Sequence, residues 1–332
     1  MTGTTGTTDA TGTTSRTTIV SGHDDTPTAD SALDWAHRTA ASWRADLVVV
    51  HACDGADHGG RGPLAGGQDD RSEVRAHIAD RLTALSAADG PEVSTRVLMV
   101  RGPAAESLVT AATGAELLVL GRGRHHVTLP WSLGSVANHV IRTSAGPVAV
   151  VPANWSAGAT DASVGTARGA YVLVGWDGSE QAVEAVRWAA CHAVRVELPL
   201  RILLGWRYST LLATTAHGRP GIPSMPEFEA TAAVLLAEAR RIARDQEPGL
   251  EVTVDAVHRP PAAALGEACG QAAVLVLGTR RLAGLERVAL GSTSAALTRH
   301  ASCPVVVVPG HTVEVQPPAG RDAVLGSALP AP

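Results

Sequence analysis

Short runs of apolar, mostly β-branched residues alternate along the chain with alanine-rich segments whose apolar positions recur at helical spacing. Such runs are typical of buried strands, and the segments between them are typical of helices that pack on one face. In the first half, strands are predicted near 17–22, 46–52, 93–100, 116–121 and 147–151, with helices between them. In the second half, strands are predicted near 170–175, 199–205, 250–257, 273–278 and 304–308, and helices near 179–194, 227–245, 261–270 and 291–300.

The alternation of strands and helices determines the expected fold class. Parallel strands joined through helices require right-handed crossovers, and the helices then cover both faces of the sheet. Each half is therefore predicted to be an α/β, Rossmann-like domain with a doubly wound, five-stranded parallel sheet. In such sheets, ligands bind beyond the carboxyl ends of the strands, where the winding changes direction.

The two halves repeat one another. Asp24 is followed ten residues later by Asp34-Trp35-Ala36, and Asp177 is followed ten residues later by Arg187-Trp188-Ala189. Both halves end on the pattern Pro-Val-x-Val-Val-Pro. In the first half, Gly121, Gly134 and Pro147 follow one another at intervals of 13 residues. In the second half, Gly278, Gly291 and Pro304 do the same. Matched spacing at so many points indicates a tandem repeat of one domain.

Three segments lack the apolar periodicity that would offset the entropy of ordering them. They are the Thr/Gly-rich residues 1–15, the Ala/Gly/Ser/Thr-rich residues 153–168 and the Pro/Gly-rich residues 310–332. The first and last are predicted to be disordered tails, and the middle one is predicted to be an unpacked linker. The two domains are accordingly placed at 16–152 and 169–309.

Composition narrows the classes of function. The chain of 332 residues has a net charge of −5, which gives no long-range attraction to nucleic acid or to an anionic membrane. All 27 basic residues are arginine, so a Schiff-base lysine and the lysine of a Walker loop are excluded. The four cysteines have no close partner in the sequence, which is typical of thiols in a reducing compartment. Without a signal peptide or an apolar run near the ~20 residues that span a bilayer, the protein is expected in the cytoplasm.

An acidic residue follows the first predicted strand of each half, Asp24 in the first and Asp177 in the second. A carboxylate at that edge of the sheet can accept hydrogen bonds from the hydroxyls of a ribose. The same segments can simply begin a helix, with Thr26 or Ser179 as the N-cap. The two interpretations are compatible, and the sequence leaves both open.

A long loop follows the fourth predicted strand of each half. The strands end at Gly121 and Gly278, and the chain enters a helix at Gly134-Ser135 and Gly291-Ser292. Backbone N–H groups, the helix dipole and a serine hydroxyl then converge where a phosphate would be stabilised. The alternative is an ordinary strand–helix turn with a serine cap, which the repetition of the loop makes less favourable.

These loops resemble the nucleotide loop of the universal stress protein family, in which a Gly, two residues, a Gly and nine residues precede Gly-Ser or Gly-Thr. The chain has Gly121-Arg-Gly-Arg124 and Gly278-Thr-Arg-Arg281, each nine residues before Gly-Ser. The similarity covers nearly all of 17–152 and 170–309. In both halves, the middle glycine of the family pattern is an arginine, Arg124 or Arg281. A guanidinium there could bind the phosphates, or its Cβ could hold the loop away from them.

The resemblance implies an ATP site, with or without Mg²⁺, in either half. Adenine is expected against Leu120 or Leu277 and ribose at Asp24 or Asp177. Phosphates are expected at the loop and at the following helix start, on the two sets Gly121, Arg124, Gly134, Ser135 and Val136, and Gly278, Arg281, Gly291, Ser292 and Thr293. The implied function is a stress-response regulator that binds adenine nucleotide and changes its contacts with an unknown protein partner. Two alternatives stay open, a scaffold of the same fold that binds no nucleotide and a slow ATPase, although no catalytic residue is identified.

The last predicted strands, 148–151 and 305–308, are apolar and would lie at a sheet edge, where an uncovered strand invites association. In the family, two such edges pair across a homodimer. A tandem chain can form this pair internally, which predicts a pseudo-twofold unit joined through its two last strands.

The remaining candidates are given structural interpretations. Trp35 and Trp188 are predicted to lie in the core, and His51 and His258 are predicted to be hydrogen-bonded structural residues. Adjacent histidines rarely converge on one ion, so His125-His126 is predicted to be a solvated loop and no metal site is expected.

Overall fold

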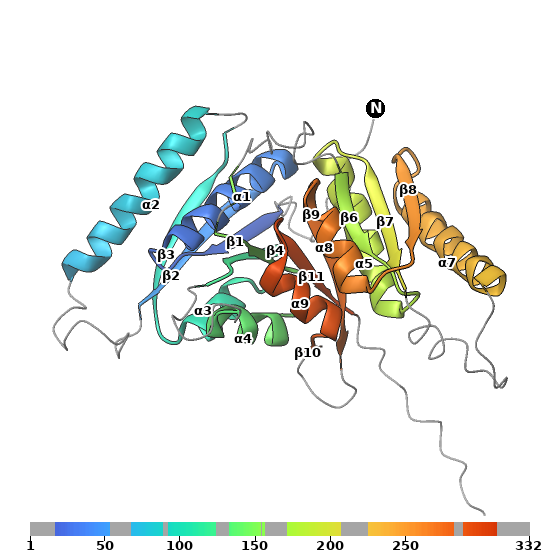
Figure 1. Ribbon diagram of the computed structural model, residues 1–332. Coiled ribbons are helices and arrows are strands. Elements are labelled where there is room, and N and C mark those ends of the chain that lie inside the picture. The colour runs from blue at the N-terminus through green and yellow to red at the C-terminus, as the bar shows by residue number, and fades with distance from the viewer. Residues whose placement is uncertain are drawn as a thin grey trace, which may run out of the picture.

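The computed structural model describes residues 17–53, 68–88, 92–123, 133–153, 155–156, 171–206, 225–281 and 288–310. Within them, eleven strands form one sheet, in the order β3-β2-β1-β4-β5-β11-β9-β6-β7-β8, with β10 paired to β9 beside this path (Figure 1). No helix in this part of the chain is long and apolar enough to cross a membrane. The predicted tails, and the predicted linker beyond Ser156, lie outside the described residues.

Each half has the predicted succession of strands and helices. The elements of the first half are β1 (Thr18–Gly22), α1 (Pro27–Trp43), β2 (Asp46–Cys53), α2 (Gln68–Ala88), β3 (Thr95–Arg101), α3 (Ala104–Ala111), β4 (Leu117–Gly121), α4 (Ser135–Thr143) and β5 (Val148–Val151). Those of the second are β6 (Tyr171–Gly175), α5 (Glu180–Arg195), β7 (Leu200–Gly205), α7 (Met225–Gln246), β8 (Val252–Val257), α8 (Pro261–Ala268), β9 (Ala272–Arg281), β10 (Val288–Ala289), α9 (Ser292–His300) and β11 (Val305–Pro309).

The strand order is the same in both halves. The first half runs β3-β2-β1-β4-β5 and the second runs β8-β7-β6-β9-β11, and all of these neighbours are parallel. The winding therefore changes direction between β1 and β4 and again between β6 and β9. These two places are where a doubly wound sheet binds its ligands. The predicted fold class is confirmed.

The two halves join through their last strands, as predicted. β5 and β11 are antiparallel neighbours, with Val150 opposite Val305 and Val148 opposite Val307. Helices cover both faces of this junction, and the valines of the two strands are at most 5% exposed. Such runs are apolar at every position because both faces of the strands are buried.

Two apolar layers hold helices to the sheet. On one face, α1, α2, α5 and α7 contribute buried residues such as Leu33, Ile78, Ala189 and Phe228. On the other face, α3, α4, α8 and α9 contribute Leu108, Val140, Leu265 and Leu297. Neighbouring positions of one strand point to opposite layers, so each sheet residue belongs to one layer or the other.

Aromatic side chains of α1 and α5 meet where the two halves pack together. The Trp43 indole N–H donates to Nδ1 of His192 at 3.2 Å, and the ring of Trp188 stacks on His192 with centroids 5.0 Å apart. The guanidinium carbon of Arg195 lies 4.5 Å from the centroid of the Trp43 ring. Trp35 is also buried, with its ring 6.4 Å from that of His192. Trp35 and Trp188, predicted to be core residues, therefore belong to the contact between halves.

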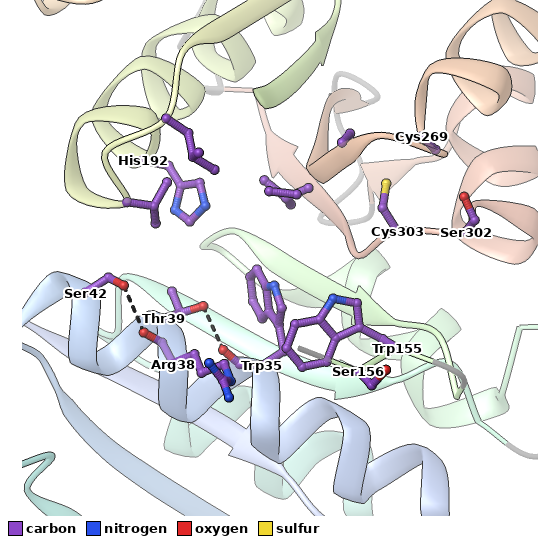
Figure 2. A pocket seen from close by; sticks show the side chains of 15 residues that line it. Trp35, Arg38, Thr39, Ser42, Trp155, Ser156, His192, Cys269, Ser302 and Cys303 are labelled. Atoms are coloured by element: carbon purple, nitrogen blue, oxygen red, sulfur yellow. Dashed lines mark hydrogen bonds between the residues drawn. The ribbon is translucent and has the colours of Figure 1, made fainter. Parts of the chain in front are cut away.

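A cavity of about 190 Å³ lies between the halves, with α1 on one side and the second half on the other (Figure 2). Trp155 and Ser156 line it, and Trp155 packs partly buried against the first apolar layer. The Ser31 hydroxyl donates to the carbonyl of Ala153 at 2.9 Å. The start of the segment predicted to be an unpacked linker is therefore packed, because an indole offers far more apolar area than its Ser, Gly and Ala neighbours.

Two cysteines line this cavity. Cys269 and Cys303 are far apart in the sequence but adjacent in the fold, and all four cysteines of the chain are free thiols. The hydrogen bond with Cys269, together with burial, raises the pKa of the Cys303 thiol well above its ordinary value. A thiol held in its neutral form is a poor nucleophile and a poor metal ligand. We therefore assign this pair to packing.

Replacing Ser179 by alanine is expected to lower the free energy of unfolding by about 1 kcal/mol, because the Ser179 hydroxyl caps the first turn of α5. The hydroxyl oxygen accepts from the backbone N–H of Ala182 at 3.3 Å. Urea denaturation followed by circular dichroism would measure the change. Ser179→Thr keeps the hydroxyl and should cost much less. An equal loss in both variants would contradict the capping role.

Candidate functional site

The loops after β1 and β6 place their carboxylates at the reversal of strand order. One oxygen of Asp24 accepts from the Thr26 hydroxyl at 2.5 Å. One oxygen of Asp177 accepts from the Ser179 hydroxyl at 2.5 Å and from its backbone N–H at 3.0 Å. Both carboxylates are exposed. Thr26 and Ser179 are the N-caps of α1 and α5, which confirms the capping interpretation. A contact with ribose stays a prediction.

The two loops differ in backbone strain. The residue after the aspartate has a left-handed conformation in both, with φ 56° at Asp25 and φ 78° at Gly178. Glycine adopts this conformation without steric cost, whereas a residue with a Cβ pays for it. The loop of the second half is therefore the less strained of the two.

Strand register places each aspartate beside the loop of the neighbouring strand. Val174 of β6 pairs with Val276 of β9, and Ser21 of β1 pairs with Val119 of β4. Asp177 and Asp24 follow the ends of β6 and β1, directly beyond these paired residues. Neighbouring strands lie about 4.8 Å apart, so the carboxylate and the start of the loop share one edge of the sheet.

Gly121 and Gly278 are required for packing. A Cβ on Gly121 would lie 2.7 Å from the carbonyl oxygen of Thr28, and one on Gly278 would lie 2.3 Å from that of Gln181. The first turns of α1 and α5 thus rest directly on the ends of β4 and β9. The sequence predicted Gly121 and Gly278 as phosphate contacts. In the described residues, the space beside each glycine is occupied by the backbone of a helix of the same half.

Leu120 and Leu277, the predicted adenine contacts, are only 5% and 4% exposed. Each side chain fills the space over a glycine of the neighbouring strand, and a Cβ on Gly22 or Gly175 would lie 2.6 Å or 2.8 Å from it. Both leucines belong to the α3/α4/α8/α9 layer. Little of either surface is left for a nucleobase.

The two ends of the loop of the first half, at residues 122–123 and 134, are in contact. The Gly134 N–H donates to the Arg122 carbonyl at 3.1 Å, and Gly123 is held at φ 90°. A Cβ on Gly123 would lie 2.9 Å from the Cα of Gly134. Arg124 and the rest of the loop to Trp131-Ser132 lie outside the described residues, so the predicted role of Arg124 stays a prediction. Ser135 is exposed and Val136 is partly buried at the start of α4.

The second loop is built differently. β9 runs three residues beyond Gly278 and pairs antiparallel with β10, with Arg281 opposite Val288. The prediction ended this strand at 278, because the Thr-Arg-Arg sequence that follows has no apolar periodicity. The strand continues because backbone pairing with β10 holds these residues. The backbone of Arg281 is thus part of a hairpin, and its side chain lies outside the described residues.

The start of α9 is open. Gly291 is its N-cap without any side-chain hydrogen bond, and no atom of the described residues lies within 4 Å of the place where its Cβ would be. Ser292 is exposed and Thr293 partly exposed. The Ser294 hydroxyl donates to the Gly278 carbonyl at 3.3 Å, which holds the helix start against the end of β9. The N-terminal N–H groups of α9 therefore face a position that a small anion can reach.

Arg122 is a residue that sequence reasoning did not single out. Its guanidinium donates to the carbonyl of Ala301, in the other half, at 2.5 Å. Burial lowers the pKa of this guanidinium, although the nearby thiols of Cys303 and Cys269 act in the opposite direction. The base of the first loop is thereby tied to the C-terminal end of α9. Nothing in the sequence distinguishes this arginine from Arg124.

The described residues also contain a histidine–aspartate group at the start of the loop that carries Asp24. His23 follows β1, and its Nε2 lies 3.1 Å from an oxygen of Asp30 on α1. The prediction for His51 is confirmed, because its Nδ1 is 2.8 Å from the carbonyl of His23. His258 stacks on Trp206, with ring centroids 4.0 Å apart. His125-His126 lies outside the described residues.

Comparison with known proteins identifies the family of the chain. The family model described as the universal stress protein family matches residues 15–152 and 171–309, so the chain belongs to that family, with two domains in tandem. A universal stress protein of Mycobacterium tuberculosis strain H37Rv is 28% identical over 300 residues, which are 87% of this chain and 96% of that protein. A second one from the same strain is 29% identical over 301 residues, 87% and 95% of the two chains.

A solved structure shows the same fold along both halves of the chain. The crystal structure of a universal stress protein from Archaeoglobus fulgidus matches with a TM-score of 0.59 and 18% identity, covering 89% of this chain and 98% of that one. A universal stress protein solved in complex with cAMP is 26% identical over 42% of this chain and 98% of its own, with a TM-score of 0.33. The tandem Rossmann-like fold predicted from the sequence is confirmed.

Proposed function

We propose that this universal stress protein binds an adenine nucleotide, ATP with or without Mg²⁺, at the strand-order reversal of its second half. The observation that carries the proposal is the open N-terminus of α9 beside Asp177. Asp177 follows β6, and the chain passes from the end of β9 through β10 to α9. β6 and β9 are parallel neighbours, so both segments leave the sheet at its carboxyl edge. A doubly wound sheet binds its ligand there.

The phosphates are assigned to the start of α9. Its first N–H groups lack a side-chain cap, and Gly291 leaves room for an anion to approach the backbone. The partial positive charge of a helix N-terminus stabilises phosphate. Arg281 is the proposed second contact, because its backbone lies in the hairpin that leads to this helix. A guanidinium can bind two phosphate oxygens at once.

Ribose is assigned to Asp177. One of its oxygens is engaged by Ser179, and the carboxylate is exposed. The adenine is assigned to the surface next to Leu277 and not to the leucine itself, which is 4% exposed. In the first half, the closed base of the loop and the strained Asp25 make Asp24, Gly134 and Ser135 the weaker site.

The second site is connected to the first half. β10, part of the hairpin that precedes α9, packs against α4 of the first half. A nucleotide that ordered this hairpin would therefore change a surface that both halves share. We propose that this change controls binding of a protein partner, in keeping with a regulator in a stress response. Slow hydrolysis of ATP and a scaffold without nucleotide are the competing functions.

Mg-ATP is expected to stabilise the protein by about 2.7 kcal/mol at a ligand concentration 100 times the dissociation constant. A thermal-shift titration would measure this stabilisation. Gly291→Val should abolish it, since the branched side chain would cover the start of α9, where the described residues leave open space around the Cβ position. Gly249→Val, in an exposed turn that is also open, is the matched control and should keep the shift.

Three outcomes decide between the functions. A shift that Gly291→Val and Asp177→Ala lose supports the nucleotide site in the second half. The absence of a shift at millimolar Mg-ATP would contradict it and favour the scaffold. Release of ADP over hours that Asp177→Ala abolishes would instead indicate an ATPase.

A further inference from the structure

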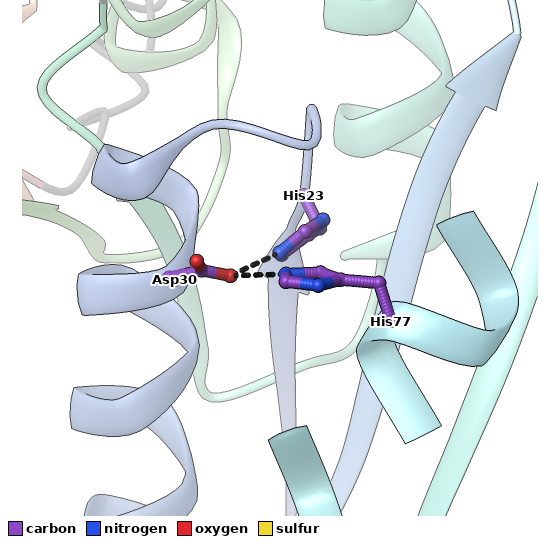
Figure 3. Close-up of side chains that lie close together, drawn as sticks. All are labelled: His23, Asp30 and His77. Carbon is purple, nitrogen blue, oxygen red and sulfur yellow. Dashed lines mark hydrogen bonds and ion pairs between the residues drawn. The ribbon is translucent and has the colours of Figure 1, made fainter. Parts of the chain in front are cut away.

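Three side chains from three separate elements of the first half converge on one point (Figure 3). Nε2 of His23 lies 3.1 Å from Oδ1 of Asp30, and Nε2 of His77 lies 3.0 Å from the same oxygen. His23 follows β1, Asp30 is in the first turn of α1, and His77 is on α2. All three ligand-type atoms lie within 4.8 Å of one another.

The internal repeat shows that the fold does not need this group. The alignment that pairs Asp24 with Asp177 places Trp176 where the first half has His23, and Val183 where it has Asp30. Trp176 is 4% exposed, and Val183 packs against the apolar layer. The same positions are therefore filled well by apolar side chains. An imidazole and a carboxylate taken from water cost free energy that apolar residues would not.

The spacing fits a metal ion. Nitrogen and oxygen ligands lie about 2.0–2.2 Å from zinc, so two ligands of a tetrahedral site lie about 3.3 Å apart. The two nitrogen–oxygen distances of this cluster, 3.1 Å and 3.0 Å, are close to that value. The two nitrogens are at most 4.8 Å apart, and they would have to approach to about 3.3 Å for one ion to contact all three atoms.

The protonation states also suit a metal ion. Burial lowers the pKa of His23, which keeps the imidazole neutral despite its contact with Asp30. Burial acts to raise the pKa of Asp30, but hydrogen bonds from His77 and His23 outweigh this effect, and the net shift is downward. Metal ions bind neutral imidazole and ionised carboxylate.

We propose that His23, Asp30 and His77 bind a divalent transition-metal cation of the Zn²⁺ class, with the remaining coordination position open to water or another ligand. Three protein ligands with an open position are typical of reactive sites, whereas structural zinc sites have four protein ligands. The site is independent of the nucleotide site proposed for the second half.

Entry of the ion is possible from the side of α2. The His77 side chain is 46% exposed, whereas that of His23 is fully buried. Once an ion occupies Nε2 of His23, the remaining imidazole proton lies on Nδ1. The backbone N–H of Asp25, 3.3 Å from that nitrogen, must then turn away. Metal binding thus moves the loop that carries Asp24.

The test uses the full chain, stripped of metal by a chelator and titrated with Zn²⁺ in competition with a chromophoric chelator. One ion per chain is expected. His77→Gln and Asp30→Asn should each weaken binding at least about 100-fold, since even a change in the residues that orient a ligand costs 10–100-fold. His77 is exposed, so its replacement should not disturb folding, which circular dichroism checks.

Two controls distinguish this site from others. His139→Gln, on the exposed side of α4, and the double variant His125→Gln with His126→Gln should bind Zn²⁺ as the parent does. Co²⁺ gives a second readout, because its visible absorption reports the ligands directly and should change in His77→Gln. Unchanged affinity in His77→Gln and Asp30→Asn, or loss of binding only in the double variant, would overturn the proposal.

Discussion

Replacing Gly278 by alanine is expected to lower the free energy of unfolding by about 3 kcal/mol or more, at the upper end of the cost of overpacking. The added Cβ would lie 2.3 Å from the carbonyl oxygen of Gln181 and 2.6 Å from its carbonyl carbon. These are backbone atoms in the first turn of α5, so no change of rotamer relieves the clash. The helix must move away from the end of β9, which disturbs the whole apolar layer beneath it.

Thermal unfolding would measure this effect as a fall in melting temperature of roughly 6–12 °C. Gly121→Ala should act in the same direction, since its Cβ would lie 2.7 Å from the Thr28 carbonyl oxygen. The control is Gly249→Ala, at a turn where none of the described atoms lies within 4 Å of the new Cβ. If Gly278→Ala and Gly249→Ala melt at the same temperature, α5 does not rest on β9 as described.

Acidification is expected to destabilise the protein through His192, the second large effect. Burial, and to a smaller extent the charge of Arg195, lowers the pKa of this imidazole from 6.5 to about 3. The unfolded chain thus binds a proton below about pH 6.5, whereas the folded protein does so only near pH 3. The free energy of unfolding should fall by about 1.4 kcal/mol per pH unit across this window, or roughly 5 kcal/mol in total.

Chemical denaturation at several pH values, on the parent and on His192→Gln, isolates this contribution. The variant is less stable at neutral pH because it loses the stack on Trp188, but it has no proton to gain. Its stability should therefore fall less than that of the parent. Between about pH 6.5 and pH 4.5, the difference between the two falls should be about 2.7 kcal/mol. His139→Gln, exposed on α4, should follow the parent. Parallel pH profiles for the parent and His192→Gln would contradict the prediction.

The fold could be predicted because its signal is local and repeated. Each buried strand is a short apolar run, and the equal spacings from Gly121 to Pro147 and from Gly278 to Pro304 align the halves without any structure. The pairing of β5 with β11 also followed, because an apolar strand at an edge needs a cover. The prediction was wrong at the end of β9, where Thr-Arg-Arg continues the strand through backbone pairing with β10.

The candidate site could be predicted only in outline. The sequence predicts Asp177 and Gly291 at one edge of the sheet, and the structure makes β6 and β9, the strands that precede them, parallel neighbours. It could not show that Gly278 makes room for a helix or that Leu277 is covered, because both facts depend on how distant segments pack. His23 and His77 are 54 residues apart in sequence, and only the placement of α2 beside α1 brings them together.

The antiparallel pair of β5 and β11 has a consequence for how the two halves can differ. In a homodimer, this junction would come apart on dilution, and every substitution would occur on both sides of the axis. In one chain, the partner strand is present at an effective concentration on the order of millimolar or above, whatever the amount of protein. Each half is therefore free to specialise. The first half has His23 where the second half has Trp176. Every molecule therefore carries the two different halves in a fixed ratio of one to one.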